Sequence, residues 1–142
     1  MKTRLLAILL LFVSATALAA DAPPAADDPF ARNFFAPDFV MKHQKEIGLT
    51  ERQRDTIKAE IQKVQSKFLD LQFDMQSEME KLNDLVQSRP VDEARTLAQA
   101  ETVMRLETDT KKLHLGMLVR IKNMLTESQI QRLAQLREAA AP

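Results

Sequence analysis

Nine apolar residues recur at steps of three and four within residues 57–86, and this repeat constrains the fold more than any other feature. They are Ile57, Ile61, Val64, Phe68, Leu71, Met75, Met79, Leu82 and Val86. Such spacing places side chains on one face of an α-helix. Thr50 suits the N-cap of this helix, with Gln53 completing a capping box, and Pro90 ends it. The segment predicts one helix roughly 55 Å long.

Three further helices are expected around this one. A second long helix runs from about Val91 to Asn123, with Pro90, Asp92 and Glu93 in its first turn. Its apolar side consists of Leu97, Ala100, Met104, Leu115, Leu118 and Ile121. A short helix from near Pro37 is closed by Gly48, and a last short helix follows Leu125. The long pair is expected to form an antiparallel hairpin in an all-α domain spanning residues 37–140.

The composition agrees with helices and excludes several other classes. Two glycines and six prolines are too few for the turns of an all-β fold. The absence of cysteine excludes a disulfide scaffold, a thiolate zinc site, an iron–sulfur cluster, a cysteine nucleophile and a lipoprotein anchor.

The first 20 residues have the pattern of a secretory signal peptide. Lys2 and Arg4 precede an apolar run from Leu5 to Val13, and Ala17-Leu18-Ala19 resembles a cleavage site. The alternative, a transmembrane anchor, needs about 20 apolar residues, many more than this run contains. We therefore expect a secreted, periplasmic protein with no membrane anchor after cleavage.

The mature chain is close to neutral. Loss of Lys2 and Arg4 leaves 18 basic and 20 acidic side chains, a net charge of −2. Because phosphate binding requires a basic excess, nucleic acid is not an expected partner.

Residues 21–36 form a lead before the helical domain. Residues 21–29 are rich in proline and aspartate and contain no large apolar side chain, which is typical of a flexible tether. Phe30, Phe34, Phe35 and Phe39 follow closely. This aromatic group either covers the end of the helical core or forms an exposed docking patch.

The sequence contains no catalytic signature, and we expect no enzyme activity. It lacks the G-x-S-x-G, phosphate-loop, H-E-x-x-H and EF-hand patterns. Two long helices and two short ones leave apolar surface uncovered, which suits a homodimer or direct binding of clients.

A few side chains could bind a transition metal, although no cofactor is expected. His114 and Met117 are three residues apart on one helix, and His43 lies near Glu46. Imidazole and thioether groups on one face suit copper(I), nickel, cobalt or zinc. The alternative is that these histidines have no ligand and that the methionines fill the core.

Two short motifs carry a resemblance to a known family. LTERQ at residues 49–53 and LTESQ at 125–129 share Leu49, Thr50 and Gln53 with Leu125, Thr126 and Gln129. With the signal peptide and the helix order, they resemble the Spy/CpxP superfamily of periplasmic proteins, which includes CnrX and ZraP, over roughly residues 37 to 138.

The resemblance implies a homodimeric helical cradle. Spy-like members are ATP-independent chaperones for unfolded envelope proteins, and CpxP-like members restrain a membrane sensor kinase. CnrX-like members sense nickel or cobalt and report to an anti-sigma factor. Those sensors carry two histidines one helical turn apart, whereas Phe39 and Ile47 flank His43 here. Chaperoning is therefore our first hypothesis, and metal sensing or kinase regulation is the alternative.

Charge is unevenly distributed along the expected hairpin. Residues 42–67 carry seven basic and four acidic side chains, and residues 111–122 carry four basic and none acidic. Residues 70–109 carry ten acidic and four basic side chains. Candidate client contacts near the basic end are Lys58, Lys63, Lys67, Phe68 and Met75.

Overall fold

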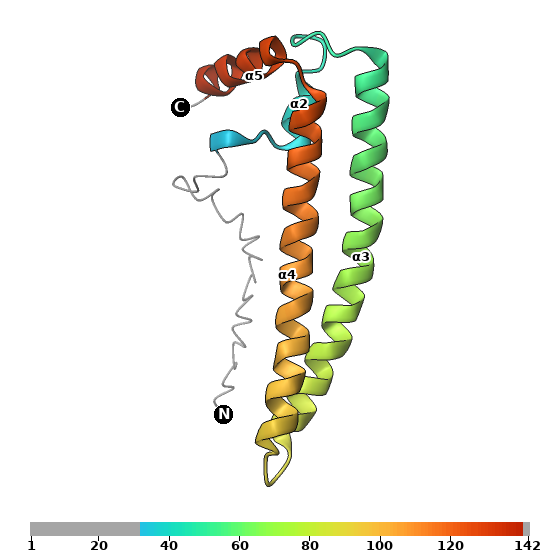
Figure 1. Ribbon diagram of the computed structural model, residues 1–142, viewed down its shortest axis with the longest axis vertical. Coiled ribbons are helices and arrows are strands. Elements are labelled where there is room, and N and C mark those ends of the chain that lie inside the picture. Colours follow the sequence, from blue (N-terminus) through green and yellow to red (C-terminus); the bar gives the residue numbers. More distant parts are fainter. Residues whose placement is uncertain (1–31, 141–142) are drawn as a thin grey trace, which may run out of the picture.

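The structure, a computed structural model, describes residues 32–140 (Figure 1). Its helices are α2 (Pro37–Lys42), α3 (Glu51–Gln87), α4 (Glu93–Met124) and α5 (Glu127–Ala139). This part of the chain contains no β-strand, so the all-α class and the short, long, long, short order are confirmed. The predicted signal peptide and most of the lead lie outside the described residues.

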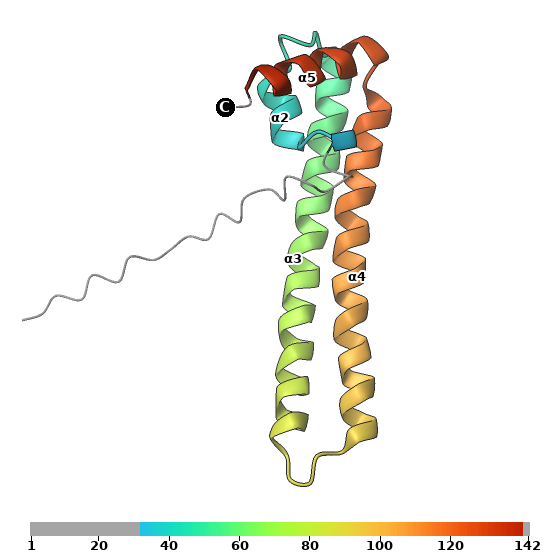
Figure 2. The ribbon, with the colours of Figure 1, turned by 90° about the vertical axis from the view of Figure 1, so that its left-hand side faces the viewer.

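Helices α3 and α4 form the expected antiparallel hairpin (Figures 1 and 2). We call the end where α2 and α5 lie the base, and the end at the α3–α4 turn the tip. At the tip, the Asp92 carboxylate accepts a hydrogen bond from the Arg95 N–H at 3.0 Å and is the N-cap of α4. Pro90 therefore lies in the turn, and its predicted place in the first turn of α4 is wrong.

Helix α2 is shorter than expected. It begins at Pro37 and ends at Lys42, and residues 43–48 form successive turns. Gly48 has φ of 62°, the left-handed conformation that glycine adopts without steric cost. It thus has the predicted conformation, but it ends the turns and not the helix itself. The chain then reverses into α3, with the Leu49 N–H bonded to the Gln44 carbonyl at 2.9 Å.

The hydrophobic core lies at the base. The buried residues that pack there come from every helix and from the segments between them: Phe35, Val40, Ile47, Ile57, Val64, Met117, Ile121, Leu125 and Leu133. Of residues 65–112, all of which the structure describes, only Val103 is buried. The middle and tip of the hairpin therefore consist of two helices with no third element over them.

The apolar face of α4 differs from the expected one. Leu97 and Met104 are 62% and 56% exposed, and Leu115 is also exposed. The buried residues of α4 are Val103, Met117 and Ile121, of which only Ile121 belongs to the predicted set. Half of the expected apolar stripe is thus exposed to solvent, while Ala100 and Leu118 are half-buried and Ile121 is buried. None of the described helices is both long and apolar enough to cross a membrane.

Candidate functional site

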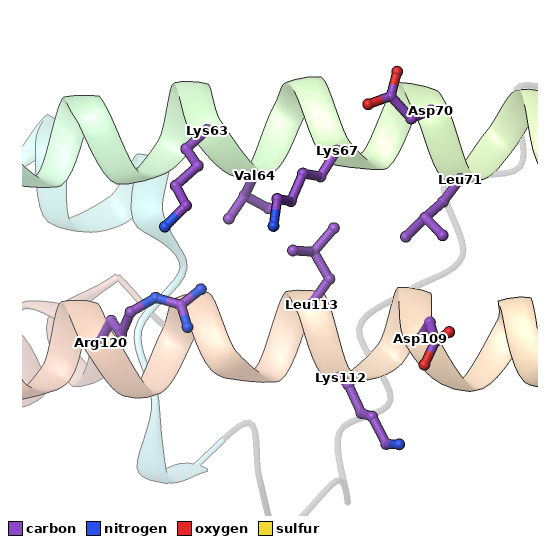
Figure 3. A pocket seen from close by; sticks show the side chains of 9 residues that line it. All are labelled: Lys63, Val64, Lys67, Asp70, Leu71, Asp109, Lys112, Leu113 and Arg120. Carbon is purple, nitrogen blue, oxygen red and sulfur yellow. The ribbon is translucent and has the colours of Figure 1, made fainter.

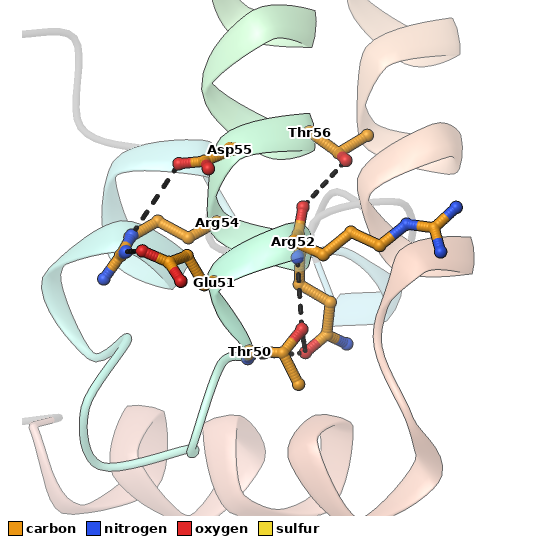
Figure 4. Close-up of polar contacts among 7 residues, drawn as sticks. Thr50, Glu51, Arg52, Arg54, Asp55 and Thr56 are labelled. Carbon is orange, nitrogen blue, oxygen red and sulfur yellow. Dashed lines mark hydrogen bonds and ion pairs between the residues drawn. The ribbon is translucent and has the colours of Figure 1, made fainter.

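Both L-T-x-x-Q motifs form capping boxes at helix starts. The Thr50 hydroxyl accepts the Gln53 N–H at 3.1 Å, and the Gln53 side-chain oxygen accepts the Thr50 N–H at 3.0 Å. Thr126 and Gln129 repeat the arrangement at 3.3 and 2.9 Å. Figure 4 shows the first of these helix starts, where Arg54 also pairs with Glu51.

The two motifs also bind each other. The Gln53 amide donates to the Gln129 side-chain oxygen at 2.9 Å, and the Gln129 amide donates back at 3.1 Å. Each amide donates in addition to a backbone carbonyl, Gln53 to Met124 at 2.7 Å and Gln129 to Gly48 at 3.2 Å. This glutamine pair joins segments 76 residues apart in the sequence. Because these side-chain groups are occupied by one another and by the backbone, the motifs act as a structural clasp.

The leucines of both motifs pack at the base of the hairpin. Leu125 is buried in the core, and Leu49 packs against it from the preceding turn. Sequence reasoning identified each motif as a helix cap but missed their mutual contact. The repeated position of the glutamine in both motifs was the signal that could have indicated it.

An apolar groove of about 1610 Å³ runs beside the base half of the hairpin, on the side of α2. Its lining includes Phe34, Phe35, Phe39, Ile61, Phe68, Leu69, Leu113, His114, Leu115 and Leu118. Phe68, Leu69 and Leu115 are exposed along it. The groove therefore offers large apolar side chains to solvent at one continuous site.

Two cations hold the aromatic segment at the edge of this groove. Lys122 lies 5.4 Å from the centre of the Phe34 ring, and Arg137 lies 4.7 Å from that of Phe35. Lys122 also donates to the Asn33 carbonyl at 2.9 Å. The interpretation that the aromatic group covers the end of the helical core holds for Phe35. Phe35 is buried in the core, whereas the half-buried Phe34 lines the groove, and Phe30 lies outside the described residues.

A second, smaller cleft of about 490 Å³ lies between α3 and α4 (Figure 3). It is lined by Lys63, Val64, Lys67, Asp70, Leu71, Asp109, Lys112, Leu113 and Arg120. Val64 and Leu113 line both hollows, so this pair separates the cleft from the groove. In Figure 3, α2 lies behind the two long helices. The cationic cleft and the apolar groove thus occupy opposite faces of the hairpin.

The structure divides the expected client contacts between these faces. Phe68 lines the apolar groove, whereas Lys63 and Lys67 line the cationic cleft. Lys58 and Met75 line neither hollow. The five residues therefore do not form one surface.

The candidate metal ligands are also dispersed. His43 Nδ1 lies 2.7 Å from the Glu46 carboxylate, and its ring packs 4.5 Å from that of Phe39. His114 and Met117 both line the apolar groove, and Met117, only 7% exposed, also belongs to the core. Within residues 32–140, no three His, Asp or Glu side chains are grouped as a metal site would require.

These features define a small all-helical protein, a hairpin clasped at one end with hollows on both faces. The chain matches the family model for heavy-metal resistance over residues 4–132 and belongs to that family. Its members are helical, typically periplasmic proteins of the Spy/CpxP, CnrX and ZraP type, so the resemblance is confirmed. No curated protein and no solved structure matched the chain.

Proposed function

We propose that this protein is a periplasmic, ATP-independent chaperone that holds unfolded segments of envelope proteins in its apolar groove. The observation that carries the proposal is the continuous set of large apolar side chains exposed along that groove. Exposed apolar patches of this kind typically mark interaction sites.

Apolar contact is the force that would hold a client here. An unfolded chain exposes apolar side chains, and their burial contributes about 25 cal/mol per Å² removed from water. The groove presents leucine and phenylalanine without a deep, shaped pocket, which suits many different sequences held by weak contacts. Lys111 and Arg137 at its edge add positive charge that attracts acidic clients. No nucleotide is required for such binding.

A second copy of the chain is part of this proposal. Apolar side chains remain exposed along the hairpin beyond the groove, toward the tip: Met79, Val86, Leu97 and Met104. A two-fold homodimer is the commonest way to cover such a surface.

The chaperone activity is tested by aggregation of a chemically denatured client without ATP. We expect the mature protein to suppress light scattering at a near-stoichiometric ratio. Phe68→Ser, which removes a 41% exposed groove side chain, should weaken suppression. Phe73→Ser is the matched control, because Phe73 lies on the same helix, is 70% exposed and lines neither hollow. No suppression at several-fold excess, or equal loss in both variants, would contradict the proposal.

Metal sensing is the second candidate, favoured by the family's description as heavy-metal resistance. His114 lines the groove, where a metal could reach it, and His43 and Glu46 are already paired. Calorimetric titration with nickel, cobalt, copper and zinc tests this candidate. Stoichiometric binding that is lost in His114→Ala would favour metal sensing, and the absence of heat for all four metals would reject it.

A further inference from the structure

The proposed function uses the apolar groove and leaves the cationic cleft on the opposite face unexplained. Three cations converge on the space between the long helices there, Lys63 and Lys67 from α3 and Arg120 from α4 (Figure 3). Neither lysine has an ion-pair partner among the described residues. Two carboxylates, Asp70 and Asp109, also line the cleft, and neither forms an ion pair with these lysines. Asp70 points away from α4 in Figure 3, and Glu60, three residues before Lys63, pairs with Arg120. The lysine charges are therefore available to a ligand.

Arg120 is held in place at the edge of this cleft. Its Nε pairs with the Glu60 carboxylate, whose side chain is only 11% exposed. Its guanidinium group lies over Gly116, where a Cβ would be 3.0 Å from Arg120 Nη1. Glycine is unfavourable inside a helix, and at this position it leaves room for the arginine. The cation is therefore positioned before any ligand binds.

The rest of the lining consists of three apolar side chains and three charged ones, Asp70, Asp109 and Lys112. Val64, Leu71 and Leu113 form its apolar surface between the two helices. A volume of about 490 Å³ lies within the range of small-molecule sites. A free phosphate would use the cations but leave this apolar surface in water, whereas a neutral lipid would leave the lysine charges unpaired.

We propose that the cleft binds an anionic amphiphile, a molecule with an acyl chain and a carboxylate or phosphate head group. The head group lies between Lys63, Lys67 and Arg120, and the chain lies along Val64, Leu71 and Leu113. Charge-assisted hydrogen bonds fix the head, and apolar contact holds the chain. This binding is separate from client binding, because the two sites lie on opposite faces.

The test is calorimetric titration of the mature protein with dodecyl phosphate below its micelle concentration. Inorganic phosphate and dodecyl maltoside separate the contributions of head and chain. We expect stoichiometric binding of dodecyl phosphate at least about tenfold tighter than that of either comparison ligand. Laurate in place of dodecyl phosphate distinguishes a carboxylate from a phosphate head.

Matched double variants locate the site. Lys63→Gln with Lys67→Gln should weaken dodecyl phosphate binding at least about tenfold. Lys45→Gln with Lys58→Gln has the same net charge, changes exposed lysines that line neither hollow, and should bind as the unmodified protein does. Circular dichroism would verify that both variants remain helical.

Several outcomes would overturn the inference. Equal weakening in the two double variants would mean attraction to overall charge, not a site. Inorganic phosphate binding as tightly as dodecyl phosphate would mean a simple anion site. Loss of dodecyl phosphate binding in Phe68→Ser but not in Lys63→Gln with Lys67→Gln would place the amphiphile in the apolar groove.

Discussion

The base and the remainder of the hairpin are built from the same two helices but differ in how they are stabilised. At the base, nine buried apolar residues pack together, and the glutamine pair joins the starts of α3 and α5. Toward the tip, Val103 is the only buried side chain in residues 65–112. A polar contact supports the pairing there, since Gln99 donates to the Glu78 carboxylate at 2.6 Å and to its carbonyl at 2.9 Å.

The difference arises from what covers the helices. Each long helix has one apolar stripe, and two helices alone can bury only the part of each stripe that faces the other. At the base, α2, α5 and the segment around Phe35 cover the outer sides as well. The comparison shows that the base contains nearly all of the buried core, while the rest of the hairpin leaves apolar and charged side chains exposed.

The largest expected effect comes from opening a cavity at the base. Leu133→Ala removes a side chain with no solvent exposure and should lower the free energy of unfolding by about 2–5 kcal/mol. Leu97→Ala, near the tip, removes a 62% exposed side chain and should cost less than about 0.5 kcal/mol. Urea unfolding followed by circular dichroism measures both.

Repeating both measurements at several protein concentrations tests whether a second copy of the chain contributes to these costs. A cost of Leu97→Ala that grows with protein concentration would mean that a second copy covers the tip half. Equal, concentration-independent costs for the two variants would contradict the distinction between base and tip.

A smaller loss is expected from breaking the glutamine pair. Gln129→Ala removes both bonds with the Gln53 side chain and the bond to the Gly48 carbonyl, at about 1–3 kcal/mol. A double-mutant cycle with Gln53→Ala should give a coupling energy clearly different from zero. Gln131→Ala, on the exposed side of α5, is the control and should be nearly neutral. Additive effects of the two glutamine substitutions would mean that each acts only as a local helix cap.

Local rules predicted most of the helix starts. The capping boxes at Thr50 and Thr126 and the apolar repeat of α3 follow from residues within one turn of each other, and all are present. The start of α4 was misplaced by two residues because Asp92 proved to be the cap, and the end of α2 because turns precede Gly48.

Contacts between distant segments were much harder to predict. The polar stretch from Glu107 to Lys112 interrupts the repeat of α4, so the apolar side predicted for this helix includes Ile121 but not the buried Val103 and Met117. The same uncertainty in rotation placed Lys63 and Phe68 in one expected surface, whereas they line opposite faces. Spacing fixes the period of a helix but not which side of it meets the neighbour.

Gly116→Ala should stabilise the hairpin, in contrast to the preceding variants. Alanine in a helix interior is favoured over glycine by about 1 kcal/mol, and the new Cβ would meet only the Arg120 guanidinium group, 3.0 Å from Nη1, which must shift slightly. We expect a gain of about 0.5–1 kcal/mol in thermal or urea unfolding. Ala98→Gly, on the exposed side of the same helix, should lose a similar amount. A destabilised Gly116→Ala would mean that the position of Arg120 contributes more to stability than the helix preference does.

The smallest effect concerns the polar contact that supports the tip half. The hydrogen bond from Gln99 and then the contact with Lys81, 2.6 Å away, hold the pKa of Glu78 below its ordinary value. A carboxyl whose pKa is lower in the folded state stabilises the fold above its unfolded pKa, and this contribution disappears as the pH falls through the folded pKa.

Glu78→Gln should therefore reduce the melting temperature slightly at neutral pH and make no difference in acid below the folded pKa. Glu80→Gln, two residues along the same helix, is the control. Its difference in melting temperature from the unmodified protein should change less between neutral and acid pH. Melting curves followed by circular dichroism across this range measure both variants. A Glu78→Gln difference that persists unchanged in acid would mean that the charge of Glu78 does not support the pairing of α3 with α4.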